Sequence, residues 1–263
     1  MDEGIVRVFH SKAIDSFPAH IIGRKVYKYD TVGSTNDAAF MYALKGENEG
    51  SVFWARAQTK GRGRLGRRWV SHKDKGLYFS IILKPDILVK EAAKITLLVA
   101  LGICEGLRKF SGQQCLIKWP NDIVINDKKI GGILTEMDSE AGKIKFIIAG
   151  IGIDTNFSRS DLPVRESISL RILMQKEIDN ENVLSACVKA VDERYAQFKR
   201  NGFSPILKEV QALSSLWGRR VKIDGHIEGA AVDFDSDGGL VVRQPNGFLK
   251  HFYAGDVNLL RCK

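Results

Sequence analysis

The segment Gly61–Arg68 has the sequence GRGRLGRR, with three glycines and four arginines in eight residues. Glycine lets the backbone wrap closely around a ligand at an entropic cost, which favours a flexible loop here. Arginine carries planar, permanently charged groups that suit carboxylate and phosphate oxygens. The segment therefore predicts a loop that can close over an anionic ligand.

Two common glycine motifs do not account for this loop. The P-loop pattern G-x-x-x-x-G-K-S/T is absent from the sequence. The glycine spacing of residues 61–66 matches the dinucleotide pattern G-x-G-x-x-G. However, the stretch Arg67–Ser71 is a poor start for the helix that this pattern needs. The sequence therefore gives weak support for a dinucleotide site.

Apolar residues recur with two different periods along the chain. Leu77–Leu83 places every second residue on one apolar face, which predicts a strand. Ala92–Phe110 and Val183–Arg200 repeat apolar residues every three or four positions, which predicts two amphipathic helices. A short helix is predicted over Asn36–Leu44, with Ser34 or Thr35 as its N-cap. Further short strands are predicted over 26–30, 51–55, 116–119, 123–125, 130–136 and 143–153.

The pattern changes after residue 216. Short strands with turn glycines follow Trp217, as in small all-β modules. We therefore predict an α+β chain in three parts. An irregular N-terminal lead-in covers residues 1–25, a mixed β-sheet domain with flanking helices covers 26–216, and a small C-terminal β-barrel covers 217–263.

The composition limits where the protein can reside. The chain has 263 residues, of which 44% are hydrophobic and 27% charged, so it can bury a large core. No apolar run reaches the ~20 residues of a membrane helix, and the N-terminus lacks the pattern of a secretory signal. The four cysteines and five histidines show no metal-binding spacing. These features predict a cytoplasmic protein that does not bind membranes.

The formal net charge of +9 is compatible with two kinds of partner. Clustered Lys and Arg release counterions from nucleic-acid phosphates, which fits a basic nucleic-acid-binding module. A small phosphate-bearing substrate also needs arginines, and the densest basic run coincides with the densest glycine run at Gly61–Arg68. The charge alone leaves both interpretations open.

Five segments, in a fixed order, resemble biotin protein ligases. The stretch Gln58–Trp69 is similar to the biotin-binding loop of that family. The other four segments are Ser34–Asn36, Lys118–Asp122, Lys128–Leu134 and Gly150–Ile153. The stretch from Trp217 onward is similar to the family's small C-terminal barrel, so the resemblance covers roughly residues 26–262. It implies that residues 26–216 form a catalytic domain that binds biotin and ATP.

The resemblance implies a role for each matching residue. The biotin site would comprise Ser34, Thr35, Asn36, Gln58, Gly61, Arg62, Gly63, Arg64, Lys129, Gly131 and Gly132. The nucleotide site would comprise Arg64, Arg67, Trp69, Asn121, Lys129, Asp154 and Asn156. The family often has Asn where this chain has Asp154. The catalytic residues would be Arg64, Asp122 and Lys129, and Asp122 would also hold magnesium.

The implied reaction has two steps. Biotin is activated with ATP to biotinyl-5′-AMP, and the biotinyl group then passes to a specific lysine of a biotin carboxyl carrier protein domain. The residue types fit the first step, because two anions must be brought together and their charge neutralised. ATP and magnesium would both be required, and a homodimer is suggested.

Two alternatives stay open, and one activity of the family is not expected. The alternatives are acyl transfer like that of lipoate-protein ligases and a basic nucleic-acid-binding module.

Many family members also carry an N-terminal helix-turn-helix domain that binds DNA. Only about 25 residues precede the first predicted strand of the catalytic domain, too few for such a domain, so no specific DNA binding is expected.

Overall fold

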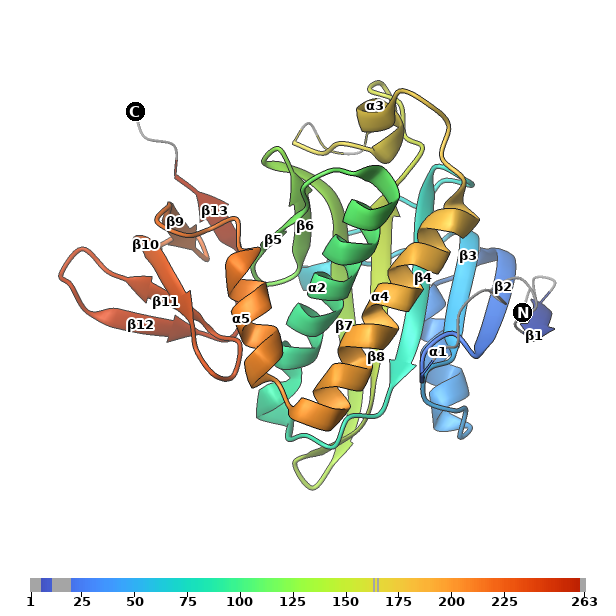
Figure 1. Ribbon diagram of the computed structural model, residues 1–263, viewed down its shortest axis with the longest axis horizontal. Helices are drawn as coiled ribbons and strands as arrows, with labels where there is room; N and C mark the ends of the chain where they lie inside the picture. Colours follow the sequence, from blue (N-terminus) through green and yellow to red (C-terminus); the bar gives the residue numbers. More distant parts are fainter. Residues whose placement is uncertain (1–5, 11–19, 163, 165, 261–263) are drawn as a thin grey trace.

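The computed structural model describes residues 6–10, 20–162, 164 and 166–260. Its centre is an eight-stranded sheet in the order β1-β2-β3-β4-β8-β7-β6-β5 (Figure 1). β2 and β3 are parallel while the other neighbours are antiparallel, so the sheet is mixed, as predicted. The strands are β1 (Val6–His10), β2 (Lys25–Val32), β3 (Val52–Gln58), β4 (Gly76–Leu83), β5 (Leu116–Lys118), β6 (Asp122–Ile125), β7 (Lys128–Glu140) and β8 (Lys143–Asp154).

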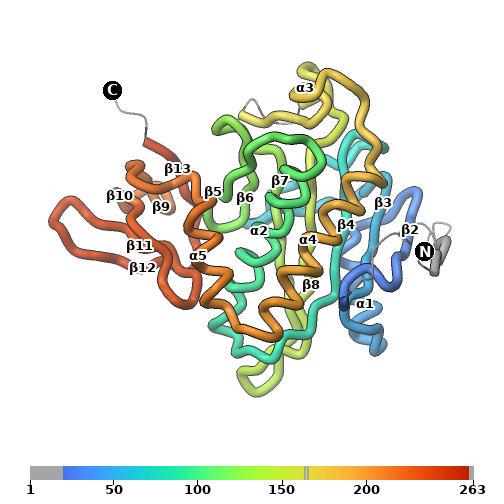
Figure 2. Tube along the Cα trace, viewed as in Figure 1, coloured from blue at the N-terminus to red at the C-terminus, as the bar shows by residue number. Residues whose placement is uncertain are grey.

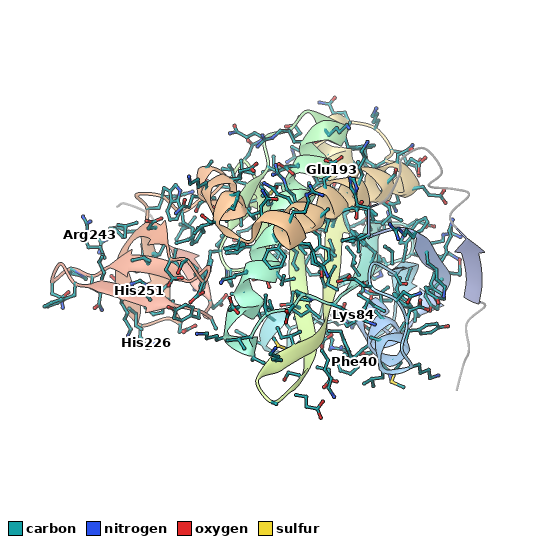
Figure 3. The ribbon with its side chains drawn as sticks, turned by 60° about the horizontal axis from the view of Figure 1, so that its bottom comes forward. Phe40, Lys84, Glu193, His226, Arg243 and His251 are labelled. Atoms are coloured by element: carbon teal, nitrogen blue, oxygen red, sulfur yellow. The ribbon has the colours of Figure 1, made fainter. Side chains whose placement is uncertain are left out.

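Helices cover both faces of this sheet. The two long helices, α2 (Ala92–Ser111) and α4 (Asn180–Asn201), pack side by side on one face. The helix α1 (Thr35–Leu44) packs on the other face, and Figure 3 shows Glu193 of α4 and Phe40 of α1 on opposite sides of the sheet. The shorter helices are η1 (Arg64–Gly66), η2 (Val89–Glu91), α3 (Leu170–Met174) and α5 (Ser204–Ala212).

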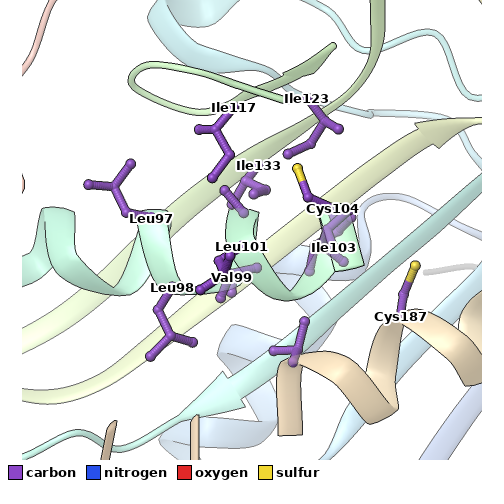
Figure 4. Packing of buried hydrophobic residues seen from close by; sticks show 14 of the residues in the cluster. Leu97, Leu98, Val99, Leu101, Ile103, Cys104, Ile117, Ile123, Ile133 and Cys187 are labelled. Carbon is purple, nitrogen blue, oxygen red and sulfur yellow. The ribbon is translucent and has the colours of Figure 1, made fainter. Parts of the chain in front are cut away.

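The core follows the two predicted periods. Every second residue of Leu77–Leu83 belongs to the main core beneath α2 and α4, as the alternating pattern predicted. Ile82 faces the opposite side and packs in the smaller core beneath α1, so β4 is buried on both faces. Cys104 of α2 points toward the strands that carry Ile117 and Ile123 (Figure 4). The central strands are therefore held from both sides.

Two glycines of α2 allow the long helices to approach closely. A Cβ atom on Gly102 would lie 2.7 Å from the Cα of Val191, and one on Gly106 would lie 2.6 Å from the Cα of Cys187. Both obstacles are backbone atoms of α4, which cannot turn aside as a side chain can. The α2–α4 contact therefore depends on these two glycines.

We expect Gly106→Ala to destabilise the fold by about 1–3 kcal/mol, because the added methyl overpacks the helix contact. Urea unfolding followed by circular dichroism measures the change. Lys109→Ala, on the exposed side of the same helix, serves as a control and should change stability by no more than about 0.5 kcal/mol. A Gly106→Ala protein as stable as the control would contradict this account of the helix contact.

The C-terminal part forms its own antiparallel sheet, in the order β12-β11-β10-β9-β13, at the opposite end of the molecule from β2 (Figure 2). Trp217 packs on Phe234, with ring centroids 4.7 Å apart. The buried indole nitrogen of Trp119 donates a hydrogen bond of 3.0 Å to the carbonyl of Gly238, which ties this sheet to the central one. The α+β prediction is confirmed. The strands are β9 (Arg220–Ile223), β10 (Ile227–Phe234), β11 (Leu240–Arg243), β12 (Leu249–Phe252) and β13 (Val257–Leu259).

The lead-in over residues 1–25 was predicted to be irregular, and for one segment this was wrong. Val6–His10 forms β1, which pairs antiparallel with Lys25–Tyr29. Five residues give too little alternation to identify a strand from sequence, and the partner strand supplies the hydrogen bonds. Within the described part of the chain, no helix is long and apolar enough to cross a membrane.

Candidate active site

A cleft of about 500 Å³ opens where several distant segments meet. Its walls come from the N-terminus of α1, the loop 62–70, the turn before β6, the strands β7 and β8, and the segment 256–258 of the C-terminal sheet. Most of the predicted site residues line it: Ser34, Thr35, Asn36, Gln58, Arg62, Gly63, Arg64, Arg67, Trp69, Asn121, Asp122, Lys129, Gly132 and Asp154.

Three predicted residues do not line this cleft. Gly61 packs closely against Trp69 and Ser71, and Gly131 packs against the backbone of β8. Asn156 is a correction, because both ends of its amide already bind backbone groups: Nδ2 donates to Ile178 O at 2.8 Å, and Oδ1 accepts from Ile178 N at 2.8 Å. Asn156 therefore anchors the chain between β8 and α4 instead of reaching a nucleotide.

One end of the cleft holds a network of polar side chains. Asn36 donates to Glu136 Oε2 at 2.6 Å, and its Oδ1 lies 2.6 Å from the hydroxyl of Ser80. The backbone N–H of Thr35 donates to Gln58 Oε1 at 2.8 Å. Asn36, Thr35 and Ser80 are all buried, so the network presents fixed donors and acceptors away from solvent.

The start of α1 exposes part of this network to the cleft. Ser34 occupies the N-cap position of α1, but its side chain makes no capping hydrogen bond. A Cβ atom on Gly150 of β8 would collide with the side-chain amide of Asn36. The hydroxyl of Ser34 is thus available to a ligand, and Gly150 provides the room in which Asn36 lies.

The arginines of the loop 61–68 bind distant parts of the chain. Arg62 pairs with Asp37 of α1 at 2.7 Å and with Glu136 of β7 at 3.0 Å. Arg64 donates to Asn121 Oδ1 at 3.1 Å. These contacts hold the loop over the cleft.

The next arginine continues this pattern on the outer side of the loop. Arg67 pairs with Asp256 of the C-terminal sheet at 2.5 Å, and this ion pair holds the pKa of the Asp256 carboxyl below its usual range. Arg64 is half-buried, and this burial lowers the pKa of its guanidinium. Two arginines of the loop, Arg62 and Arg67, are therefore paired with acids of the same chain.

A lysine–carboxylate pair lies in the middle of the cleft. Lys129 Nζ is 2.6 Å from Asp122 Oδ1 and 5.4 Å from the ring centroid of Trp69. The pair crosses the β6–β7 hairpin, where the Cβ position of Gly132 is only 3.4 Å from each side chain. This arrangement places an ammonium group and a carboxylate side by side in the middle of the cleft.

At the end of β8, Asp154 is buried and lines the cleft. Burial raises the pKa of its carboxyl to about 7, against the opposing charge of Lys129, which lowers the pKa. Among the described residues, no group forms a hydrogen bond with Oδ1 of Asp154 or with Nε1 of Trp69, although both atoms are buried. Two polar atoms in the cleft therefore lack partners.

The sequence prediction missed several residues of the site. Ser80 is polar within the apolar run Leu77–Leu83, and that exception was a usable signal. Glu136 stands on a predicted strand and gives no sign of its contact with Asn36. The residues that line the cleft but were not among the predicted site residues are Leu65, Arg68, Val70, Lys118, Ile133, Leu134, Gly150, Ile151, Gly152, Val164, Ser167, Asp256, Val257 and Asn258.

Comparisons with known families agree with this geometry. The model of the biotin/lipoate A/B protein ligase family matches residues 30–154, the part of the chain that supplies the polar network, the basic loop and the Lys129–Asp122 pair. The model of the biotin protein ligase C terminal domain matches residues 218–260. The fold and the site thus define a ligase of this class.

Individual relatives narrow the assignment. The chain is 35% identical over 245 residues to the bifunctional ligase/repressor BirA of Bacillus subtilis, covering 91% of this chain and 75% of that protein. It is 28% identical to the biotin–(acetyl-CoA-carboxylase) ligase of Paracoccus denitrificans, covering 81% and 92%. The biotin protein ligase of Aquifex aeolicus in complex with biotin and ATP superposes with a TM-score of 0.75 at 30% identity, covering 90% and 99%. The chain belongs to the biotin/lipoate A/B protein ligase family and, within it, to the biotin protein ligases.

Proposed function

We propose that the protein activates biotin with ATP to biotinyl-5′-AMP and transfers the biotinyl group to a specific lysine of a biotin carboxyl carrier protein domain. The order of chemical groups along one cleft carries this proposal. A network of hydrogen-bond donors and acceptors is followed by the Lys129–Asp122 pair and by a further polar end at Asp154. Biotin has the complementary order, with a polar ureido ring at one end and a carboxylate at the other.

The polar network suits the ureido ring. That ring presents two N–H donors and one carbonyl acceptor in a fixed plane. Ser34, Thr35 and Asn36 offer hydroxyl and amide groups at the start of α1, and Gln58 is already fixed by Thr35 and by the hydroxyl of Ser71 at 3.0 Å. Matching buried polar groups reject analogues that lack them, which favours biotin over lipoate, whose dithiolane ring has neither N–H nor carbonyl.

The centre of the cleft suits the first chemical step. A carboxylate oxygen of biotin attacks the α-phosphorus of ATP, the bond to the leaving oxygen breaks, and pyrophosphate departs. Lys129 and Arg64 would offset the charge of the two anions as they approach. Arg62 and Gly63, in the loop above, would close over the mixed anhydride and protect it from water.

The second step passes the biotinyl group to the acceptor. The neutral amine of the carrier lysine attacks the acyl carbon, the bond to AMP breaks, and the amine loses a proton. Asp122 is the carboxylate nearest to Lys129 and the group we assign to that proton. Gly132 has no side chain to fill the space beside the Asp122–Lys129 pair.

Magnesium fits the site only as a partner of the nucleotide. Among the described residues, no group of three or more His, Cys, Asp or Glu side chains could hold a metal ion. Asp122 supplies one carboxylate in the cleft, and magnesium in nucleotide sites commonly binds one or two carboxylates with phosphate oxygens and water. We assign Asp122 to that contact; the ion would supply further charge neutralisation at the phosphates.

The basic nucleic-acid-binding alternative loses its main support. Arg62, Arg64 and Arg67 each contact acidic or carbonyl groups of the same chain. We therefore expect only weak, nonspecific binding to DNA, with a steep dependence on salt and none on biotin. A biotin-dependent, sequence-selective footprint at physiological salt would show otherwise.

We propose a domain boundary near residue 216, supported by the separate sheet that begins after Trp217. A cytoplasmic setting is supported by free, buried thiols at Cys104, Cys115 and Cys187. A homodimer stays a prediction, which sedimentation with and without biotin would check.

The direct test is to incubate the protein with biotin, ATP, magnesium and a biotin carboxyl carrier domain. Mass spectrometry should show a gain of one biotinyl group on the carrier, at its acceptor lysine. Carrier with that lysine changed to arginine is the control and should stay unmodified. Replacing biotin by lipoate should give no product, and a lipoylated carrier would instead favour the lipoate-ligase alternative.

Ser80 gives a narrower test of the polar network. We expect Ser80→Ala to raise the KM for biotin about 5–30-fold, because losing a buried hydroxyl partner of Asn36 costs about 1–2 kcal/mol. The KM for ATP should stay within about twofold, since Ser80 lies at the Asn36 end of the cleft. Steady-state pyrophosphate release measures both constants. An equal rise in both would mean that Ser80 supports the fold instead of the biotin end.

A further inference from the structure

Asp154 stands out because its buried carboxyl faces the cleft without a partner. The residue is 3% exposed, and no described residue forms a hydrogen bond with Oδ1. The indole Nε1 of Trp69, in the same cleft, is also buried and unpartnered. An unpaired buried polar atom is costly, so such atoms in a binding cleft indicate a ligand that pairs with them.

The position of Asp154 along β8 indicates which part of the ligand it meets. Alternate residues of a strand share one face, so Gly150, Gly152 and Asp154 form a single row. Asn36 lies over Gly150, and the ring of Trp69 lies over Gly152, where in each case a Cβ atom would collide. Four residues of strand span about 13 Å. Asp154 is thus separated from the polar network by the part of the cleft that holds Lys129 and Trp69.

This order assigns the three parts of the cleft. With the biotin ring at Asn36 and the reacting groups at Lys129, the nucleoside of ATP extends toward Asp154. This assignment rests on the proposed function. The base is therefore the part of the substrate available to pair with the Asp154 carboxyl.

The chemistry of a carboxyl group depends on its proton. When protonated, it carries one donor and one acceptor side by side, which match the exocyclic amino group of adenine and the ring nitrogen next to it. When ionised, it only accepts, so the ring nitrogen would face a second acceptor and a negative charge. Adenine therefore pairs fully with the protonated form alone.

The surroundings of Asp154 favour that form at neutral pH. Burial disfavours the charged form of the carboxyl, and Lys129 of β7 favours it. Burial raises the pKa of Tyr78 on the adjacent strand β4, and the charge of Asp154 raises it further, so this hydroxyl is neutral near pH 7. The balance places the pKa of the carboxyl at about 7. Near pH 7 the group is divided between the two forms, so ligand binding can change its protonation.

We propose that Asp154 is a specificity-determining residue that pairs with the amino edge of adenine in its protonated form, so that ATP binding takes up a proton near neutral pH. The amide of an asparagine would offer the same donor and acceptor at every pH. The aspartate therefore adds a pH dependence to nucleotide binding that this position would otherwise lack.

The test compares the wild type with Asp154→Asn between pH 6 and pH 9. For the wild type, the KM for ATP should rise about tenfold between pH 6 and pH 8, as the protonated fraction falls. For Asp154→Asn it should change by no more than about twofold, and the KM for biotin should follow one profile in both proteins. Asp138→Asn is the matched control: this acid lies near Lys145 at the far end of the β7–β8 hairpin, outside the cleft, and should behave like the wild type.

Direct binding separates this inference from the proposed function. Calorimetry of ATP binding at pH 7, in two buffers of different ionisation enthalpy, should show uptake of about half a proton in the wild type and none in Asp154→Asn. Biotin activation with a KM for ATP that is flat with pH in the wild type would overturn the inference and leave the proposed function standing. Proton-linked ATP binding without biotin activation would do the reverse. Identical pH profiles in the wild type and Asp154→Asn would also overturn the inference.

Discussion

Lys129→Gln should slow the formation of biotinyl-AMP by roughly 10²–10³-fold, the usual cost of losing one preorganised charge-stabilising group. Glutamine keeps most of the side-chain length and a hydrogen-bond donor but removes the positive charge. In the proposed reaction that charge matters most when the biotin carboxylate approaches the α-phosphate. The substitution also leaves Asp122, which lies 2.6 Å from the lysine in the wild type, without its counter-charge. The uncompensated carboxylate then adds repulsion in the same place.

The transfer step should suffer less from this change. The carboxyl is then already joined to AMP, so less negative charge lies beside Lys129. The two steps are separated by measuring pyrophosphate release from ATP and biotin, and then transfer from synthetic biotinyl-AMP to the carrier domain. Lys128→Gln, the adjacent exposed lysine of the same hairpin, should match the wild type in both assays.

The pattern of losses decides the role of Lys129. A selective loss of the first step supports charge stabilisation in adenylation. Equal losses in both steps would mean that Lys129 binds the biotinyl group uniformly or acts in transfer as well. No loss in either step would make it an ordinary surface lysine, in spite of its place in the cleft.

The long helices show what a sequence pattern can predict. The helix predicted over Ala92–Phe110 spans Ala92–Ser111 in the structure, because a periodic apolar stripe identifies the buried face residue by residue. The helix predicted from Val183 begins earlier, at Asn180, where the side chain of Asp179 caps it by accepting from Glu181 N at 2.8 Å. The first turn is polar and solvent-facing, so apolar periodicity cannot detect it.

Site residues could be predicted from the sequence where a local motif specifies their chemistry. They could not be predicted where a residue distant in the sequence supplies the interaction partner. The basic loop, the Lys129–Asp122 hairpin and the start of α1 were named from local sequence, and the structure brings them into one cleft. Nothing in the sequence near Arg67 indicates Asp256, which lies 189 positions away and on a different sheet. Asn156 failed for the opposite reason: it follows a motif closely, yet the backbone of Ile178 occupies both ends of its amide.

Asp154 offers the second large effect, this time on stability. A carboxyl whose folded-state pKa is raised by burial takes up a proton on folding, so the native state loses stability as the pH rises from the unfolded value toward the folded one. Here that range runs from about 4 to about 7, and above it the full penalty is present. An asparagine has almost the same shape and never carries the charge. Asp154→Asn should therefore stabilise the protein, by up to about 4 kcal/mol above pH 7.

The gain should depend on pH in a defined direction. At pH 5 much of the penalty is absent, so the advantage of Asp154→Asn over the wild type should be about 2–3 kcal/mol smaller at pH 5 than at pH 8. Urea unfolding at the two pH values measures this difference without any ligand, and Asp138→Asn, which removes an acid outside the cleft, should show no such pH-dependent gain. An advantage that is equal at both pH values would mean that the Asp154 carboxyl is ionised throughout this range in the folded protein. An asparagine at this position would avoid this loss of stability. The simplest explanation for an aspartate here is that the proton on its carboxyl takes part in ligand binding.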